Sequence, residues 1–194
     1  MRITAWRVAA FLLLIALSVG FGFGFDAIAT AVEKSNHPRP EALSREIEQN
    51  AKTYGIPEHI LWATVKVNSD FVSNAVSDGG EIGLCQLTPA QFSFICTDLL
   101  DTEAMDAGML YDPATNLRAG SAYLSYLYDR YGVWDHAYAA YRAGTETVDA
   151  WLADPALVSE QGVLLLNKIP DTKTAAFVSS MKQAVDSYAK LYYS

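Results

Sequence analysis

Apolar residues recur every three to four positions along most of the chain, which is the spacing of one face of an α-helix. In the first such segment Leu43, Ile47, Ala51 and Tyr54 keep this spacing, and Gly55 follows as a C-terminal stop. No segment sustains the apolar–polar alternation that is typical of a half-buried strand. The pattern therefore predicts an all-α fold.

Start and stop signals divide the remaining chain into further helices. Thr88-Pro89 and Asp112-Pro113 each join a capping side chain to a proline suited to the first helical turn. The second pair opens a long helix that is expected to stop at Gly132. Other expected features are Pro57 in the first turn of a second helix, helices at 134–142, 146–152 and 172–192, and Asp171 as the cap of the last one.

The helical pattern breaks between residues 71 and 83, where Ser, Asn, Asp and Gly are concentrated. Such a composition is typical of a loop or a short hairpin. Gly79, Gly80 and Gly83 follow one another closely, and glycine permits a close approach of the backbone to a ligand. The segment is therefore a candidate wall of a binding cleft.

The N-terminus carries an export pattern. Arg2 and Arg7 precede an apolar run over residues 8–25, and small residues at 27–31 fit a cleavage site of the Ala-x-Ala type. The run is also long enough for a retained membrane-spanning anchor. A buried core helix is a third interpretation, which the lack of a polar stripe disfavours.

These patterns give three segments. Residues 1–29 are predicted to be a signal peptide or signal anchor, 30–42 a linker, and 43–194 one folded domain. The folded domain is accordingly expected outside the cytoplasm, either secreted, periplasmic or associated with the cell wall, and possible membrane attachment is confined to the N-terminal segment.

Composition narrows the class of partner. The 194 residues are 51% hydrophobic, which is enough for one buried core, and the formal net charge is −8. This balance argues against nucleic acid, because phosphate binding needs clustered basic residues. It also argues against broad attraction to anionic membranes, so an anionic partner must be held by local geometry.

Cysteine and histidine give no metal pattern. Cys85 and Cys96 could pair in an exported chain, but we favour their interpretation as two small buried hydrophobic residues. His37, His59 and His136 do not have metal-ligand spacing. Neither residue type therefore predicts a metal site.

Four motifs together resemble the lytic transglycosylase family, the goose-lysozyme-like domain named after the soluble lytic transglycosylase. They are Asn68-Ser69-Asp70-Phe71, a glycine loop ending in Gly83-Leu84-Cys85-Gln86, Asn116 with Gly120, and Ala140-Tyr141-Arg142-Ala143-Gly144. The resemblance covers residues 43–192 and implies a lysozyme-like helical domain with a short Gly-rich loop or hairpin at the cleft. It also implies a peptidoglycan glycan strand of MurNAc and GlcNAc as the ligand, and no metal or organic cofactor, because the chemistry of the family uses only a carboxylate and the substrate. The residues in register with the family are Ser69, Phe71, Ala75, Ser77, Gly80, Gly83, Leu84, Gln86, Pro89, Asn116, Gly120, Tyr123, Leu124, Tyr141, Ala143, Gly144, Thr174 and Val178.

The chain departs from the family at the catalytic position. The resemblance places the single acid/base Glu of the family at Asn68. In the family that Glu protonates the glycosidic oxygen and then acts as a base on the muramyl 6-hydroxyl, which closes a 1,6-anhydro ring. An amide gives up no proton in this range, and general acid–base help is worth about 10²–10⁴-fold in rate.

Other cleft positions differ as well. Where the family has Met, Asn, Tyr and a small Ala, this chain has Cys85, Arg142, Phe177 and Glu81. The residues that build the fold are retained. The substrate-binding set that the resemblance implies is Ser69, Cys85, Gln86, Tyr141, Arg142 and Phe177.

Two other carboxylates, Glu81 and Asp70, are candidates for the acid. Glu81 lies in the glycine loop, where Arg142 could hold it, and pairing with arginine would lower its pKa. Asp70 lies two residues past Asn68 and should point from a different face of the helix. Of the two, Glu81 is the possible substitute.

Three functions follow from these observations. The first is an extracytoplasmic lytic-transglycosylase-like protein that binds or acts on glycan strands and is impaired or inactive because Asn68 replaces the acid. The second is an active lytic transglycosylase that uses Glu81. The third is a non-catalytic helical scaffold whose cleft contacts another protein.

Overall fold

The structure is a computed structural model that describes residues 27–194. The chain divides into two compact units, Met1–Pro38 and Arg39–Ser194. The predicted signal or anchor lies outside the described residues up to position 26. No helix in the described part of the chain is both long and apolar enough to cross a membrane.

The segment predicted as a linker is partly helical. Residues 27–36 form a helix, and the next helix already begins at Glu41. Residues 27–34 contain several good helix formers and no glycine or proline. Pro38 and Pro40 then confine the non-helical stretch to a few residues.

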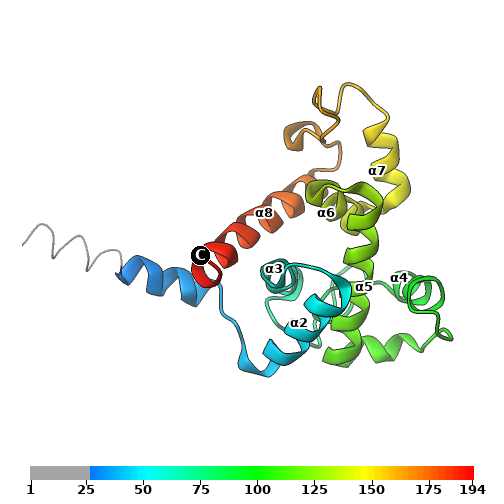
Figure 1. Cartoon of the computed structure of the whole chain (residues 1–194). Coiled ribbons are helices and arrows are strands. Elements are labelled where there is room, and N and C mark those ends of the chain that lie inside the picture. Colours follow the sequence, from blue (N-terminus) through cyan, green and yellow to red (C-terminus); the bar gives the residue numbers. More distant parts are fainter. Residues whose placement is uncertain (1–26) are drawn as a thin grey trace, which may run out of the picture. The chain divides into compact units, whose positions relative to one another are not determined.

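The second unit is all-α over the described residues, as predicted, with isolated β-bridges and no named strand (Figure 1). Its helices pack mainly as α3 on α8, α5 on α6, α6 on α8 and α2 on α5. The elements are α2 Glu41–Tyr54, α3 Glu58–Ser69, α4 Pro89–Phe94, the π-helix η1 Ile95–Leu99, the 3₁₀ helix η2 Ala107–Tyr111, α5 Pro113–Tyr131, α6 Trp134–Ala143, α7 Thr145–Leu152, the 3₁₀ helix η3 Leu166–Lys168 and α8 Thr172–Tyr192.

Most predicted helix ends are confirmed. Gly55 and Gly132 end α2 and α5 in the left-handed conformation, and Asp112 caps α5 by accepting the Thr115 N–H. Thr88 and Gln91 form a reciprocal capping box at the start of α4. Pro57 differs from expectation, because its extended backbone places it just before α3 rather than within the first turn.

The interruption at residues 71–83 is a compact loop held by isolated bridges, Val76 with Ile82 and Ile82 with Leu87. Buried Asn116 on α5 anchors it. Its Oδ1 accepts the Cys85 N–H at 2.8 Å, while Nδ2 donates to the Ile82 carbonyl at 2.9 Å and the Leu110 carbonyl at 2.8 Å. One side chain thus fixes the loop onto the helical core.

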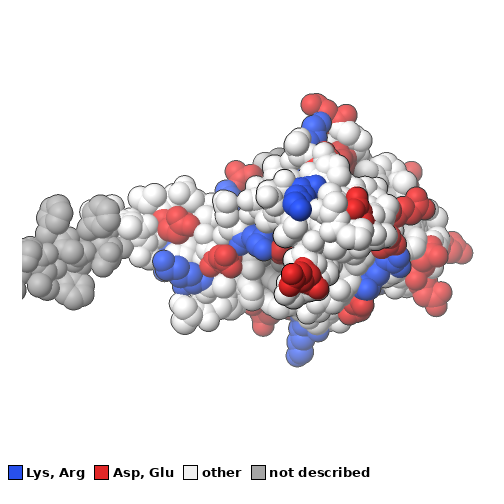
Figure 2. All heavy atoms as spheres, turned by 90° about the horizontal axis from the view of Figure 1, so that it is seen from above, with Lys and Arg blue, Asp and Glu red and all other residues white. Residues whose placement is uncertain are grey.

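The core below the loop is apolar and aromatic. Trp62 and Tyr188 are both fully buried, and their rings stack with centroids 6.4 Å apart, which ties α3 to α8. Cys85 and Cys96 are buried and free, as their interpretation as small hydrophobic residues predicts. On the face shown in Figure 2, acidic and basic side chains are interspersed without a continuous basic surface.

Asp171 caps α8, and its removal is expected to be measurable. Its carboxylate accepts the Lys173 and Thr174 N–H groups at 3.1 and 3.2 Å. Asp171→Ala should therefore lower the free energy of unfolding by about 1 kcal/mol at neutral pH, whereas Asp171→Asn, another good capping residue, should lower it less. Urea unfolding measures both.

The same cap predicts a pH dependence. The hydrogen bond from Thr174 is the largest contribution that lowers the pKa of Asp171 in the folded protein. A lowered pKa stabilises the fold above the unfolded value of about 4, and this contribution is lost as the pH falls through the folded value. The advantage of wild type over Asp171→Ala should shrink below about pH 4. An advantage that stays constant down to pH 2 would contradict this assignment.

Candidate functional site

The centre of the candidate site is a narrow pocket of about 40 Å³ between the end of α3, the glycine loop, α4 and α6. It brings together both candidate catalytic residues and three of the predicted binding residues. Its lining residues are Asn68, Glu81, Gln86, Thr88, Gln91, Tyr141 and Arg142.

The narrow pocket shares lining residues with each of two larger grooves. The first, which we call the α8 groove, has a volume of about 430 Å³ and shares Asn68, Gln86 and Arg142 with the pocket. The second, the α5 groove, has a volume of about 420 Å³ and shares Gln91 with the pocket. Shared walls make the three one cleft. The other residues of the α8 groove are Val67, Ser77, Lys173, Ala176, Phe177 and Ser180, and those of the α5 groove are Ala90, Phe94, Tyr123, Tyr126, Ala143, Gly144, Thr145, Glu146 and Thr147.

Asn68 stands in the last turn of α3, where the helix delivers its side chain to the pocket. Its Nδ2 donates to the Thr64 carbonyl oxygen at 2.8 Å, one turn earlier in the same helix. This bond orients the amide and leaves its carbonyl oxygen and its second N–H for a ligand in the pocket.

Gln86 and Tyr141 form a rigid wall. Gln86 has a backbone φ of 50°, and its Nε2 donates to the Gly83 carbonyl at 2.8 Å and the Ala75 carbonyl at 3.1 Å. The Tyr141 hydroxyl donates to the Cys85 carbonyl at 2.7 Å. Burial raises the pKa of Tyr141 well above its usual value, so that it remains a neutral hydrogen-bond donor.

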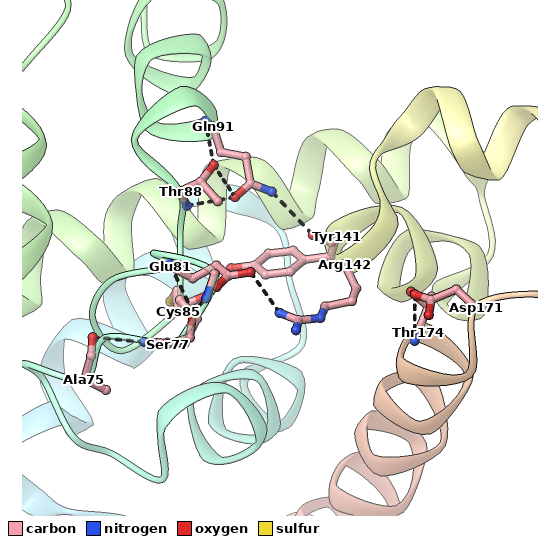
Figure 3. A network of polar contacts seen from close by, with 12 residues as sticks. Ala75, Ser77, Glu81, Cys85, Thr88, Gln91, Tyr141, Arg142, Asp171 and Thr174 are labelled. Atoms are coloured by element: carbon pink, nitrogen blue, oxygen red, sulfur yellow. Dashed lines mark hydrogen bonds and ion pairs between the residues drawn. The ribbon is translucent and has the colours of Figure 1, made fainter.

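Glu81 and Arg142 form an ion pair across the pocket. Arg142 Nη1 lies 3.2 Å from Glu81 Oε1, and the Ser77 hydroxyl donates to the other carboxylate oxygen. Figure 3 shows the Arg142 side chain running beside the Tyr141 ring towards Glu81. The Ser77 hydrogen bond, aided by the Glu81 N–H and by Arg142, outweighs partial burial and lowers the pKa of Glu81. At neutral pH Glu81 is therefore a carboxylate.

Three sequence-derived candidates lie outside the lining of the cleft. The Ser69 hydroxyl donates to the Leu84 carbonyl at 2.9 Å and so supports the loop from below. Cys85 is buried against Gly120, and burial raises the pKa of its thiol to about 12. Asp70 is exposed and pairs with Lys66 at 2.5 Å, on a different face from Asn68 as expected.

Sequence reasoning missed Lys173, Gln91 and the anchor role of Asn116. The spacing Thr88-x-x-Gln91 is a capping-box signal and could have placed Gln91 at the start of α4. Lys173 gives no sequence signal, because its place in the cleft depends on how α8 packs against α6. Within residues 27–194 no three His, Cys, Asp or Glu side chains gather as a metal site.

Comparison with known proteins agrees with this geometry. The family model described as "Transglycosylase SLT domain" matches residues 45–161. The soluble lytic murein transglycosylase of Escherichia coli (strain K12) is 28% identical over 140 residues, which cover 71% of this chain and 21% of that protein. The membrane-bound lytic murein transglycosylase C of Haemophilus ducreyi is 33% identical over 89 residues, 44% of this chain and 23% of that protein. The chain thus spans about a fifth of the length of these curated relatives.

Solved structures share the architecture. An inactive mutant of the lytic transglycosylase Slt from Pseudomonas aeruginosa, with one glutamate changed to glutamine, has a TM-score of 0.68 and 27% identity, and the match covers 78% of this chain and 24% of that one. The 70 kDa soluble lytic transglycosylase of Escherichia coli has a TM-score of 0.72 at 23% identity, with 81% and 25% covered. These matches confirm the lysozyme-like helical fold.

Proposed function

This chain belongs to the transglycosylase SLT domain family, and on that premise we propose that it is an extracytoplasmic protein that binds peptidoglycan glycan strands while being impaired or inactive as a lyase. The observation that carries the proposal is an open cleft whose narrow centre holds Asn68, an amide, where the family resemblance places the catalytic Glu.

The shape and chemistry of the cleft support binding of a glycan strand. Two grooves of about 430 and 420 Å³ flank the central pocket, so that several sugar rings could lie in succession. Tyr126 and Phe177 line opposite grooves and offer apolar ring faces. A concave site with aromatic walls and a few placed polar groups is the usual form of a ligand site.

Loss of turnover follows from the chemistry of position 68. Cleavage with ring closure needs one group that first gives and then takes a proton. The amide of Asn68 can do neither, and its Nδ2 is already engaged with Thr64. In the Pseudomonas protein inactivity likewise accompanies a carboxylate-to-amide change.

An active enzyme that uses Glu81 is the second candidate, because Glu81 shares the pocket with Asn68. Its lowered pKa argues against it, since a general acid must be protonated before the bond breaks. Glu81 is better suited to hold Arg142. If the protein does cleave glycans, Glu81→Gln should abolish the activity, and unchanged activity would exclude this role.

The proposed location outside the cytoplasm rests on the N-terminal pattern of Arg2, Arg7 and the apolar run over residues 8–25. Relatives that are named murein transglycosylases, one of them membrane-bound, support it. The protein would be secreted, periplasmic or wall-associated, and anchored to the membrane if the segment is retained.

The full chain should sediment with purified peptidoglycan and release no 1,6-anhydro products into the supernatant. Ala176→Trp, which fills the α8 groove, should weaken sedimentation at least about fivefold, which corresponds to about 1 kcal/mol. Ala153→Trp, at an exposed position after α7, is the matched control and should bind as wild type does.

Two other results of this sedimentation experiment would each contradict one part of the proposal. Anhydro products from the wild-type chain would contradict impaired catalysis. Failure of the folded wild-type chain to sediment would contradict glycan binding and favour the protein-binding scaffold.

A further inference from the structure

The α8 groove is cationic although the chain as a whole carries a net charge of −8. Arg142 and Lys173 both line it, and its other lining residues include no Asp or Glu. The two cations come from different elements, Arg142 from the end of α6 and Lys173 from the first turn of α8. A local positive field on an acidic protein favours a specific anionic ligand over nonspecific attraction.

Arg142 retains donors for such a ligand. Its single recorded bond uses Nη1 to reach Glu81 Oε1 at 3.2 Å, and 37% of its side chain is exposed. A guanidinium carries further N–H groups in a planar fork that matches a carboxylate in two parallel hydrogen bonds. Glu81 thus holds the guanidinium at the cleft without saturating it.

Lys173 is an exposed residue of the groove lining. None of the ion pairs recorded within residues 27–194 involves its ammonium group. The nearest carboxylate along the chain, Asp171, accepts hydrogen bonds from the first turn of α8 and lies outside the groove lining. Lys173 is near enough to Asp171 to help lower the pKa of that carboxyl, but the two form no ion pair within residues 27–194, so the ammonium group can still approach a ligand.

We infer that Arg142 and Lys173 form a carboxylate-binding site in the α8 groove that selects glycan strands bearing acidic groups over neutral ones. This inference rests on the proposed function and adds the specificity of the same cleft. The family resemblance gives Asn at position 142, so the charge is a property of this chain. Glu81 takes one of the Arg142 donors and partly offsets its charge, so neutralising Glu81 should strengthen the binding of an incoming carboxylate.

Peptidoglycan offers the carboxylate from two sources. In a strand without peptides the lactyl group of each MurNAc ends in a free carboxylate. In a strand with peptides that group is an amide, and the negative charges are on the stem peptide instead. Both sources present the planar anion that Arg142 would bind.

The test is calorimetric binding of the full chain to three hexasaccharides of equal length. They are a neutral GlcNAc oligomer, a peptide-free GlcNAc–MurNAc oligomer, and the same oligomer with stem peptides. We expect at least one acidic ligand to bind about tenfold more tightly than the neutral one at low salt, and the preference to narrow as salt screens the charges. The tighter of the two acidic ligands identifies the source.

Single substitutions test whether Arg142 and Lys173 cause the preference for acidic ligands. Arg142→Gln should remove most of the tenfold preference and Lys173→Gln part of it, where the preference is the ratio of the affinities of each variant for the acidic and the neutral oligomer. Glu81→Gln should increase affinity for the acidic ligand only, which general damage to the fold would not do. Lys190→Gln, an exposed lysine on the same helix outside the groove, is the matched control and should match wild type.

The failures can be told apart. If none of the three oligomers binds the folded chain, the proposed function fails and the inference fails with it. If the neutral oligomer binds as tightly as the acidic ones, or if Arg142→Gln and Lys173→Gln leave a preference intact, the inference is overturned while glycan binding stands.

Discussion

Lytic activity is expected to appear only when the centre of the cleft is changed at three positions together. Asn68→Glu alone should release few 1,6-anhydro products from peptidoglycan. The combination of Asn68→Glu, Glu81→Ala and Arg142→Asn should release them at least about 10²-fold faster than the wild-type chain, because a correctly placed acid–base group contributes about 10²–10⁴-fold.

The physical reason lies in the narrow pocket. Its volume of about 40 Å³ is lined by Asn68 together with the ion pair of Glu81 and Arg142. A new carboxylate at position 68 would stand close to the Arg142 guanidinium, which lowers the pKa of a carboxyl group. Little of the carboxyl would then be protonated, although a general acid must be protonated before it can act. Removing the ion pair both opens the pocket and removes that charge.

Matched variants make the test sharp. Asn68→Gln with the same two cleft changes carries an amide of the same length as glutamate and should remain inactive. The measurement is chromatographic quantification of anhydro-muropeptides after digestion with the full chain. A triple variant that folds and binds peptidoglycan yet releases no more product than its Gln counterpart would contradict the view that the cleft lacks only its acid.

Asn116→Ala is expected to lower the free energy of unfolding by about 2–4 kcal/mol, because it leaves the buried Cys85 N–H and the buried Leu110 carbonyl without this partner, whereas the Ile82 carbonyl keeps the Leu87 N–H at 3.1 Å. Each unsatisfied buried group costs about 1–3 kcal/mol, and water that enters the space left by the side chain recovers part of the sum. The loop that carries Glu81 and Gln86 loses its anchor, so peptidoglycan binding should weaken as well.

Urea unfolding monitored by tryptophan fluorescence measures this change. Asn167→Ala, at an exposed position in η3, is the control and should shift stability by less than about 0.5 kcal/mol. Gly83→Ala tests the same contact from the other side. Gly83 has a φ of 80°, and a Cβ there would lie 2.1 Å from Asn116 Nδ2. Equal stability of Asn116→Ala and Asn167→Ala would refute the anchor role.

The helices illustrate what could be predicted from the sequence. Asp112, Thr88 and Asp171 satisfy N–H groups within the first turn of their own helices, so their signals are local and their caps are confirmed. Residues 27–36 show the same local control, because helix formers without glycine or proline form a helix there, and Pro38 and Pro40 interrupt it before α2.

The site shows where sequence reasoning reaches its limit. The motif spacing placed Asn68, Glu81, Gln86, Tyr141 and Arg142 as candidates, and the structure brings them into one pocket. The motif spacing could not show that the Cys85 and Ser69 side chains lie outside the cleft, because the packing around a loop residue decides which way its side chain faces. Cys85 is buried, and Ser69 bonds to the loop backbone.

The all-α fold could be predicted from the sequence alone, because helical periodicity and caps depend on residues a few positions apart. The family resemblance and the amide at position 68 are visible in the sequence itself. Three contacts become visible in the three-dimensional structure alone: Asn116 holds a loop some thirty residues earlier in the chain, Arg142 bonds to Glu81, and Lys173 lines the same groove as Arg142. These contacts join residues far apart in sequence, and the packing of α5, α6 and α8 against the loop decides which of them meet.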